Sequence, residues 1–198
     1  DENCDPEITT VICVNCVYAT SCDRDLSHLL LETPNTTAAL WLHNTLDLNQ
    51  SFIFKTDIML GNNELAANEG IEGAAIVIHN APTGVNTLGI PTDGVSGYAG
   101  IIPSVAIELD AKNDVATVVN EIADDHIAIN LDGNPSSINI PEPATINGNS
   151  IDVHNDYYVT WNAIEQVLSY YMNEEKIGSY NIDLISHLGT NIAYIGVT

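Results

Sequence analysis

Short apolar runs separated by glycine, proline and asparagine recur along the whole chain, and this pattern restricts its fold more than any other feature. Each run has the length and the apolar content of one β-strand. The clearest runs cover residues 51–60, 73–79, 104–110, 157–163, 167–173, 176–181 and 193–197. Residues 182–188 predict a single helical turn, and no amphipathic pattern lasts for three turns. The chain is therefore predicted to be an all-β sandwich of two sheets.

Two neighbouring segments of this pattern differ in composition. Residues 73–79 are almost wholly apolar, which is typical of a strand buried on both faces. Residues 80–103 are rich in glycine and proline and predict a long loop. A loop of this length in a compact domain is usually functional or mobile.

Carboxylates gather around the predicted strand at 104–110. Glu108 and Asp110 are two residues apart, so their side chains point to the same face of that strand. A loop of acids and amides follows, and the chain re-enters a strand at His126. Oxygen ligands suit Ca²⁺, and an added imidazole suits a transition metal. The stretch predicts a metal site, with a solvated acidic loop as the alternative.

The overall charge limits the classes of partner. The chain has 27 Asp and Glu but only four Lys and Arg, which gives a net charge of −23. This charge argues against nucleic acid and anionic membrane surfaces as partners. It is compatible with multivalent cations, and it also keeps a protein soluble in a salty medium. No run of 18 apolar residues occurs, so no membrane insertion is expected.

The four cysteines all fall within the first 22 residues: Cys4, Cys13, Cys16 and Cys22. An even number in one short segment predicts two disulfides and an extracellular protein, secreted or at the cell surface. A four-cysteine zinc site and a redox Cys-x-x-Cys pair are the alternatives. No positively charged leader opens the chain, so a signal peptide is expected to be absent already. We expect a cysteine-stapled segment over residues 1–25 and a sandwich domain over residues 26–198.

Aromatic side chains alternate along two of the predicted strands: Tyr157, Tyr158, Trp161, Tyr170 and Tyr171. Alternation with a period of two sends half of them to the core and half outward. The outward half is a candidate binding or assembly surface.

The sequence carries no nucleophile elbow, no HExxH motif and no P-loop. Glycosidases place two carboxylates across a cleft. Glu108 and Asp110 are a pair, but so many acids lie near them that cation binding explains the pair better. We therefore expect that the protein is not an enzyme.

Several motifs together carry a resemblance. In order, they are EGAAIVIHN, GVSGYAGI, SVAIELD, DDHIAI, YYVTW and TNIAYIGVT. From Leu40 to Thr198 the chain resembles an L-type (legume-type) lectin domain, most closely the secreted bacterial surface versions. The resemblance implies a two-sheet jelly-roll β-sandwich of the concanavalin and legume-lectin kind. It also implies Ca²⁺ and a second divalent metal such as Mn²⁺, which hold the loops that bind a monosaccharide.

The resemblance implies metal ligands on both sides of the acidic loop. Asp110 would bridge the two metals, while Glu108 and His126 would serve the transition metal. The other implied ligands lie in the loop itself: Lys112 through its carbonyl, Asn113, Asp114 and Glu121. Lys112 stands where the family has an aromatic residue, Asp114 where it has Asn, and Glu121 where it usually has Asp.

The resemblance also implies a carbohydrate site beside the metals. It would comprise Glu72, Gly94, Gly97, Asn113 and Asp114. Glu72 stands where the family has the Asp of an Ala-Asp-Gly triplet. Two functions follow as hypotheses: a calcium-dependent module that binds a glycan or polysaccharide, or a structural and adhesive module with a degenerate sugar site.

The family's domain continues past the strand that matches residues 194–197 into one more strand. An unfilled sheet position would be a template for strand addition. We therefore expect a fragment of a longer protein, or a homo-oligomer or filament built by strand exchange, with residues 8–18 as the candidate donor. The alternative is that residues 1–25 fold back and fill the position within the same chain.

Overall fold

A computed structural model of the 198-residue chain describes residues 37–58, 73–91, 96–110, 126–135 and 155–198 with their side chains. At residues 10–14, 24–25 and 144–145 it describes the backbone alone. The predicted disulfides fall outside this part, because Cys4, Cys16 and Cys22 are not described and Cys13 is described by its backbone only. They stay a prediction.

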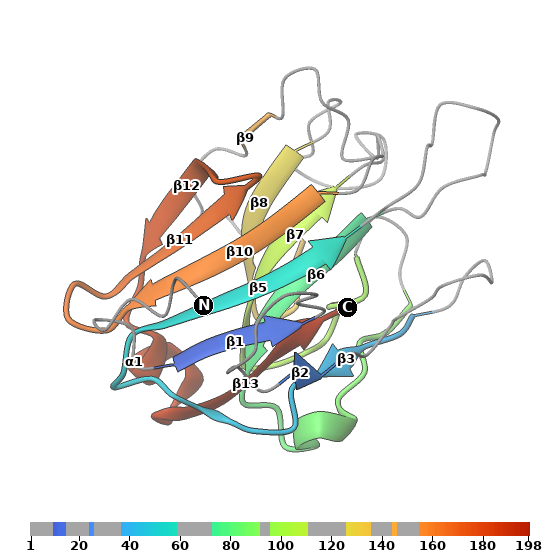
Figure 1. Cartoon of the computed structure of the whole chain (residues 1–198). Coiled ribbons are helices and arrows are strands. Elements are labelled where there is room, and N and C mark those ends of the chain that lie inside the picture. Colours follow the sequence, from blue (N-terminus) through green and yellow to red (C-terminus); the bar gives the residue numbers. More distant parts are fainter. Residues whose placement is uncertain are drawn as a thin grey trace, which may run out of the picture.

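One layer of the described structure is a six-stranded sheet (Figure 1). In sheet order its strands are β12 (Glu175–Asn181), β11 (Val167–Met172), β10 (Asn155–Asn162), β5 (Phe52–Ile58), β1 (Thr10–Val14) and β2 (Arg24–Asp25). β12, β11, β10 and β5 are antiparallel neighbours, whereas β1 runs parallel to both β5 and β2. We refer to this layer as the back sheet.

The other layer is a seven-stranded sheet, which we refer to as the front sheet. In sheet order its strands are β3 (Leu40–Trp41), β13 (Ile192–Val197), β6 (Gly73–His79), β7 (Ser104–Asp110), β8 (His126–Leu131) and β9 (Ala144–Thr145). The short strand β4 (Leu46–Asp47) also pairs with β13. A 3₁₀ turn, η1 (Gly84–Asn86), lies between β6 and β7, and the helix α1 (Leu184–Leu188) precedes β13.

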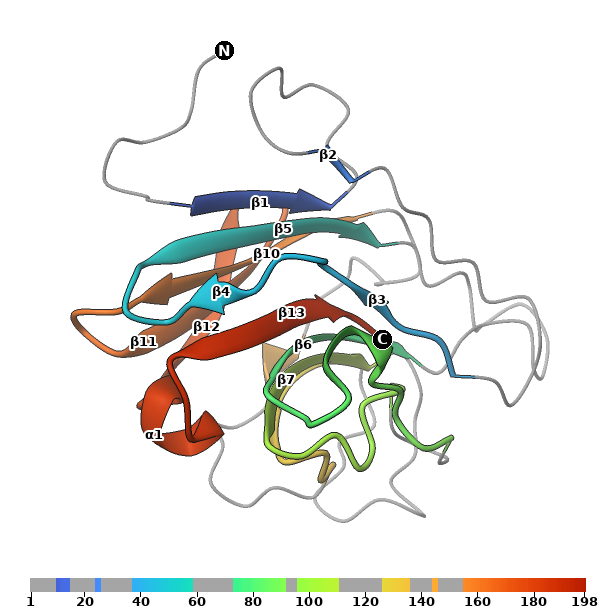
Figure 2. The ribbon, with the colours of Figure 1, turned by 90° about the horizontal axis from the view of Figure 1, so that it is seen from below.

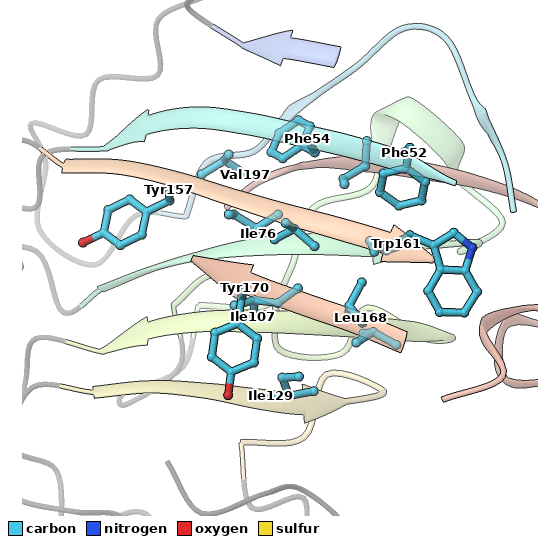
Figure 3. Close-up of a cluster of buried hydrophobic side chains, with 14 of the residues drawn as sticks. Phe52, Phe54, Ile76, Ile107, Ile129, Tyr157, Trp161, Leu168, Tyr170 and Val197 are labelled. Atoms are coloured by element: carbon cyan, nitrogen blue, oxygen red, sulfur yellow. The ribbon is translucent and has the colours of Figure 1, made fainter. Parts of the chain in front are cut away.

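The two sheets pack face to face, as Figure 2 shows from below. Between them lies a core to which β7, β10 and β13 contribute every second residue. Figure 3 shows the core members Phe54 from β5, Ile107 from β7 and Tyr157 from β10 pointing into the space between the layers. Trp161 is also buried in this core, and its indole Nε1 donates a hydrogen bond to the Leu48 carbonyl at 2.9 Å.

A second, smaller core lies on the outer face of the front sheet. The described parts of the segment between β6 and β7 cross this face (Figure 2). Tyr98 and Ile101 from that segment pack on Ala75 and Val77 of β6. β6 is therefore buried on both faces, as its sequence predicts.

The predicted strand pattern and the all-β sandwich are confirmed where the structure describes them. The single helical turn is present as α1. At the back sheet, β1 of the same chain pairs with β5, while the fold-back of residues 1–25 into a missing strand position stays a prediction. Strand exchange between copies stays a prediction. No helix in the described residues is long and apolar enough to span a bilayer.

His79 is a buried titratable group in the second core. Its side chain is 0 % exposed and lies between the rings of Trp41 and Tyr194, with centroid distances of 4.3 and 5.5 Å. Its Nδ1 accepts a hydrogen bond from the Ala81 N–H at 3.0 Å, so the neutral ring carries its proton on Nε2. Burial lowers the pKa of His79 to about 4.

The His79 pKa predicts acid sensitivity. In the unfolded chain the ring titrates near its ordinary pKa of about 6.5, so below that pH the unfolded state binds a proton that the folded state binds only near pH 4. The free energy of unfolding should therefore fall as the pH drops from 6.5 to 4, by about 3 kcal/mol in all. Urea unfolding of the wild type and of His79→Gln across this range measures the difference.

The exposed His43 supplies the matched control. His43→Gln should keep the wild-type pH dependence, whereas His79→Gln should flatten it. Equal pH dependence in wild type and His79→Gln would show that His79 does not couple folding to protonation.

Candidate functional site

The outer face of β7 carries the two predicted acids. Val105, Ile107 and Leu109 point into the core between the sheets, so Glu108 and Asp110 point to the opposite face. There Asp110 is the direct cross-strand neighbour of His126 on β8. All three predicted residues are buried, with 4 %, 3 % and 3 % of Glu108, Asp110 and His126 exposed. The solvated alternative therefore does not hold for these side chains.

The Glu108 carboxylate sits in a network of protein donors. Its Oε2 accepts hydrogen bonds from the Tyr98 hydroxyl at 2.9 Å and from Asn130 Nδ2 at 2.6 Å. Asn130 Nδ2 also lies 2.9 Å from the Tyr98 hydroxyl oxygen, which accepts from it. The longer contacts of Oε1 come from Ser96, at 3.4 Å from Oγ and 3.5 Å from N. Glu108 thus ties the loop residues Ser96 and Tyr98 to β7 and β8.

The protonation state of Tyr98 follows from its surroundings. The residue is 0 % exposed, and burial raises its pKa far above the usual range, with the nearby Glu108 charge adding to the effect. The phenol therefore keeps its proton at any physiological pH and remains a donor to Glu108. A buried carboxylate needs such donors, because an uncompensated charge in the interior costs several kcal/mol.

Gly97, predicted to contact a sugar, lies in the same loop segment. Its backbone is left-handed, with φ of +75°, and a Cβ there would come within 3.1 Å of Thr37 and Thr198. Glycine suits this position because it has no Cβ and adopts a positive φ without strain. Thr198 also holds the segment directly, because its Oγ1 donates to the Ser96 carbonyl at 2.7 Å. Residues 96–98 are thus fixed from two sides.

Sequence reasoning missed Ser96, Tyr98 and Asn130 as site residues. Ser96 and Tyr98 stand in the motif GVSGYAGI, in which only the glycines were predicted to contact a ligand. Asn130 lies on the same face of β8 as His126, four residues earlier, and this period-two pattern could have identified it. The other predicted residues lie outside the described part: Lys112, Asn113, Asp114 and Glu121 for metal, and Glu72 and Gly94 for sugar. Their roles stay predictions.

A metal at this face would draw on oxygen and nitrogen donors from adjacent strands. Asp110 and His126 supply both kinds side by side, which fits the expected ligand types. Glu108 fits in part, because short hydrogen bonds occupy its Oε2 and any metal contact falls to Oε1. Within the described residues, no three His, Cys, Asp or Glu side chains come together in a metal-binding group. A complete site would need ligands from residues 111–125.

Comparison with solved structures identifies the fold. The lectin UEA-II complexed with galactose superposes with a TM-score of 0.56 at 15% identity, over 85% of this chain and 75% of that one. The chain has a legume-lectin-like fold. Peanut lectin with a 9-mer peptide gives a TM-score of 0.54 at 14% identity, over 77% of this chain and 67% of its own. No family model matches the sequence.

The similarity does not extend over the whole of every such lectin. Lectin I from Ulex europaeus, in complex with the methyl glycoside of α-L-fucose, gives a TM-score of 0.51 at 15% identity. The alignment covers 74% of this chain but only 60% of that lectin. At these identities the likeness establishes the legume-lectin-like sandwich and leaves the ligand to be argued from the residues themselves.

The hydrogen bonds around Glu108 predict that removal of the Tyr98 hydroxyl lowers the free energy of unfolding. Tyr98→Phe keeps the ring but removes the donor to Glu108 and the acceptor for Asn130, so it should destabilise the fold by about 1–3 kcal/mol. Thermal or urea unfolding measures this loss. Tyr194→Phe is the control, because its ring stacks on His79 while no hydrogen bond involves its hydroxyl in the described residues. Equal losses in the two variants would contradict the network's importance.

Proposed function

We propose that this chain is a calcium-dependent carbohydrate-binding module of a secreted or cell-surface protein. The observation that supports the proposal best is the pairing of Asp110 with His126 on the outer face of the front sheet, beside the ordered segment that holds Gly97. This placement occurs in a legume-lectin-like sandwich. The UEA-II and Ulex lectin I structures are described as complexes with galactose and a fucose glycoside.

The proposed site divides into a metal part and a sugar part. Ca²⁺ would be held by Asp110 with Asn113 or Asp114 and Glu121, since Ca²⁺ accepts flexible oxygen coordination. His126 would serve a second divalent cation such as Mn²⁺, with Asp110 between the two metals. Glu72, Gly94 and Gly97, with Asn113 and Asp114, would contact the sugar. Ca²⁺ would supply the fixed charge that orders the acidic loop, and no covalent chemistry is involved.

A second candidate is a structural or adhesive module without a working sugar site. It is favoured by the Glu108 network, because Oε2 is committed to Tyr98 and Asn130 rather than available to a metal. Under this candidate the segment at residues 96–98 is a permanent part of the fold. It would work through protein–protein contacts and need no cation.

Glycan-array binding separates the two candidates. The lectin function predicts binding to a subset of glycans in Ca²⁺ that is lost in EDTA and lost in Glu72→Ala, because both changes disturb the same site. Glu165→Ala is a suitable control, since Glu165 lies in an exposed turn between β10 and β11. Absence of any glycan signal in Ca²⁺ would favour the structural candidate.

The metal assignment predicts different effects for two neighbouring residues. Asp110→Ala should abolish Ca²⁺ binding, whereas His126→Ala should leave it largely intact, because the imidazole serves the second metal. In the wild type, Ca²⁺ at a hundredfold excess over its dissociation constant should stabilise the fold by about 2.7 kcal/mol. Calorimetric titration and thermal melts check both points. Wild-type melts that superimpose in Ca²⁺ and EDTA would refute the calcium site.

A further inference from the structure

The back sheet carries a row of four cross-strand neighbours on its outer face. Lys55 on β5 pairs with Tyr158 on β10, and Tyr158 pairs with Tyr171 on β11. A register shift at Tyr170/Tyr171 brings Lys176 on β12 into line with Tyr171. Tyr158 and Tyr171 face outward, because the residues on either side of each in sequence are buried in the core between the sheets. These buried neighbours are Tyr157, Val159, Tyr170 and Met172.

The side chains of this row are stacked on one another. The rings of Tyr158 and Tyr171 are 4.3 Å apart and inclined by only 9°. The Lys55 ammonium lies 5.3 Å from the centre of the Tyr158 ring, within cation–π range. Both tyrosines are partly exposed and both lysines are exposed. The row therefore presents ammonium groups and phenol hydroxyls to solvent.

The row concentrates the chain's few cations. It continues through the register positions of Cys13 on β1 and Arg24 on β2, so three of the four Lys and Arg of the chain belong to one row. In the described residues, neither Lys55 nor Lys176 has a carboxylate oxygen within 4.0 Å. Both ammonium groups are therefore candidates to bind an external anion.

The adjacent rows indicate on which side a ligand would lie. On one side Thr160, Ser169 and Ser179 are cross-strand neighbours. Thr160 is partly exposed and Ser179 is exposed, so these two provide hydroxyls at the surface, whereas Ser169 is buried. On the other side Asp57 and Asp156 are direct neighbours, and the Glu174 charge also acts on the Tyr158 phenol. An anion is repelled by the carboxylates, so it would lie over the lysine–tyrosine row and the hydroxyl row.

We propose that the juxtaposition of Lys55, Tyr158, Tyr171 and Lys176 on the outer face of the back sheet binds an acidic polysaccharide that carries uronic acid groups. Its carboxylates would pair with the two ammonium groups, and its hydroxyls would bond to Thr160, Ser179 and the phenols. This site lies on the sheet opposite the proposed calcium site. It does not depend on the function proposed for that site.

Other classes of ligand fit the row less well. Lys55 and Lys176 are three strand spacings apart, about 14 Å, which a single small anion does not span but a polymer with a charge on each unit does. The two exposed lysines disfavour a protein partner, because lysine is depleted in protein interfaces, although the two tyrosines are of a type enriched there.

The test uses the full chain and two matched probes, an oligogalacturonate and its methyl ester. The wild type should bind the acid form and not the ester, with affinity that falls as salt rises and does not change in EDTA. Lys55→Gln/Lys176→Gln should weaken binding about tenfold, because both ion contacts with the polymer are removed. Lys55→Arg/Lys176→Arg, which keeps both charges, should retain binding. Far-ultraviolet dichroism confirms that each variant is folded.

Three results would overturn the proposal: no wild-type binding to the acid probe, equal binding of acid and ester, or equal affinity in wild type and the glutamine variant. Binding that EDTA abolishes and the glutamine variant retains would place the polymer on the front sheet, and this also overturns it. Loss of EDTA-sensitive glycan binding in Glu72→Ala tests the front-sheet function alone. The two proposals therefore fail separately.

Discussion

A buried carboxylate on the outer face of β7 fixes part of the loop segment that covers that face. Glu108 is 4 % exposed, so its carboxylate must be met by donors from the protein. Tyr98 and Ser96 come from the loop segment and Asn130 from β8. The loop is therefore drawn onto the sheet by polar bonds as well as by the apolar contacts of the second core. Because Thr198 holds the same segment from the side of β13, Gly97 lies at a fixed place near the predicted site.

The sequence predicted those parts of the fold that depend on periodicity. The alternation of Val105, Ile107 and Leu109 with Glu108 and Asp110 was enough to predict a strand with acids on one face. The same alternation predicted that half of the aromatic residues of β10 and β11 lie in the core. In the structure Tyr157, Trp161 and Tyr170 are buried, whereas Tyr158 and Tyr171 face outward. Burial on both faces of β6 followed from its apolar composition.

The rest depends on which residues become neighbours in space, and one sequence does not contain that information. The donors to Glu108 lie 10 and 22 positions away, on different elements. The lysine–tyrosine row exists only because the registers of four strands coincide, helped by the register shift on β12. The net charge of −23 is a sum over the whole chain, so it does not report that three of the four Lys and Arg occupy one row of the back sheet.

The central proposal is that the two acids of β7 have different tasks: Glu108 holds the loop segment, whereas Asp110 would bind a cation. Amide hydrogen exchange at residues 96–101, measured without metal in Glu108→Gln and Asp110→Asn, tests this division most directly. We expect faster exchange of this segment in Glu108→Gln, because the Glu108 carboxylate accepts hydrogen bonds from Ser96 and Tyr98, and a smaller change in Asp110→Asn. Faster exchange in Asp110→Asn with no change in Glu108→Gln would contradict it.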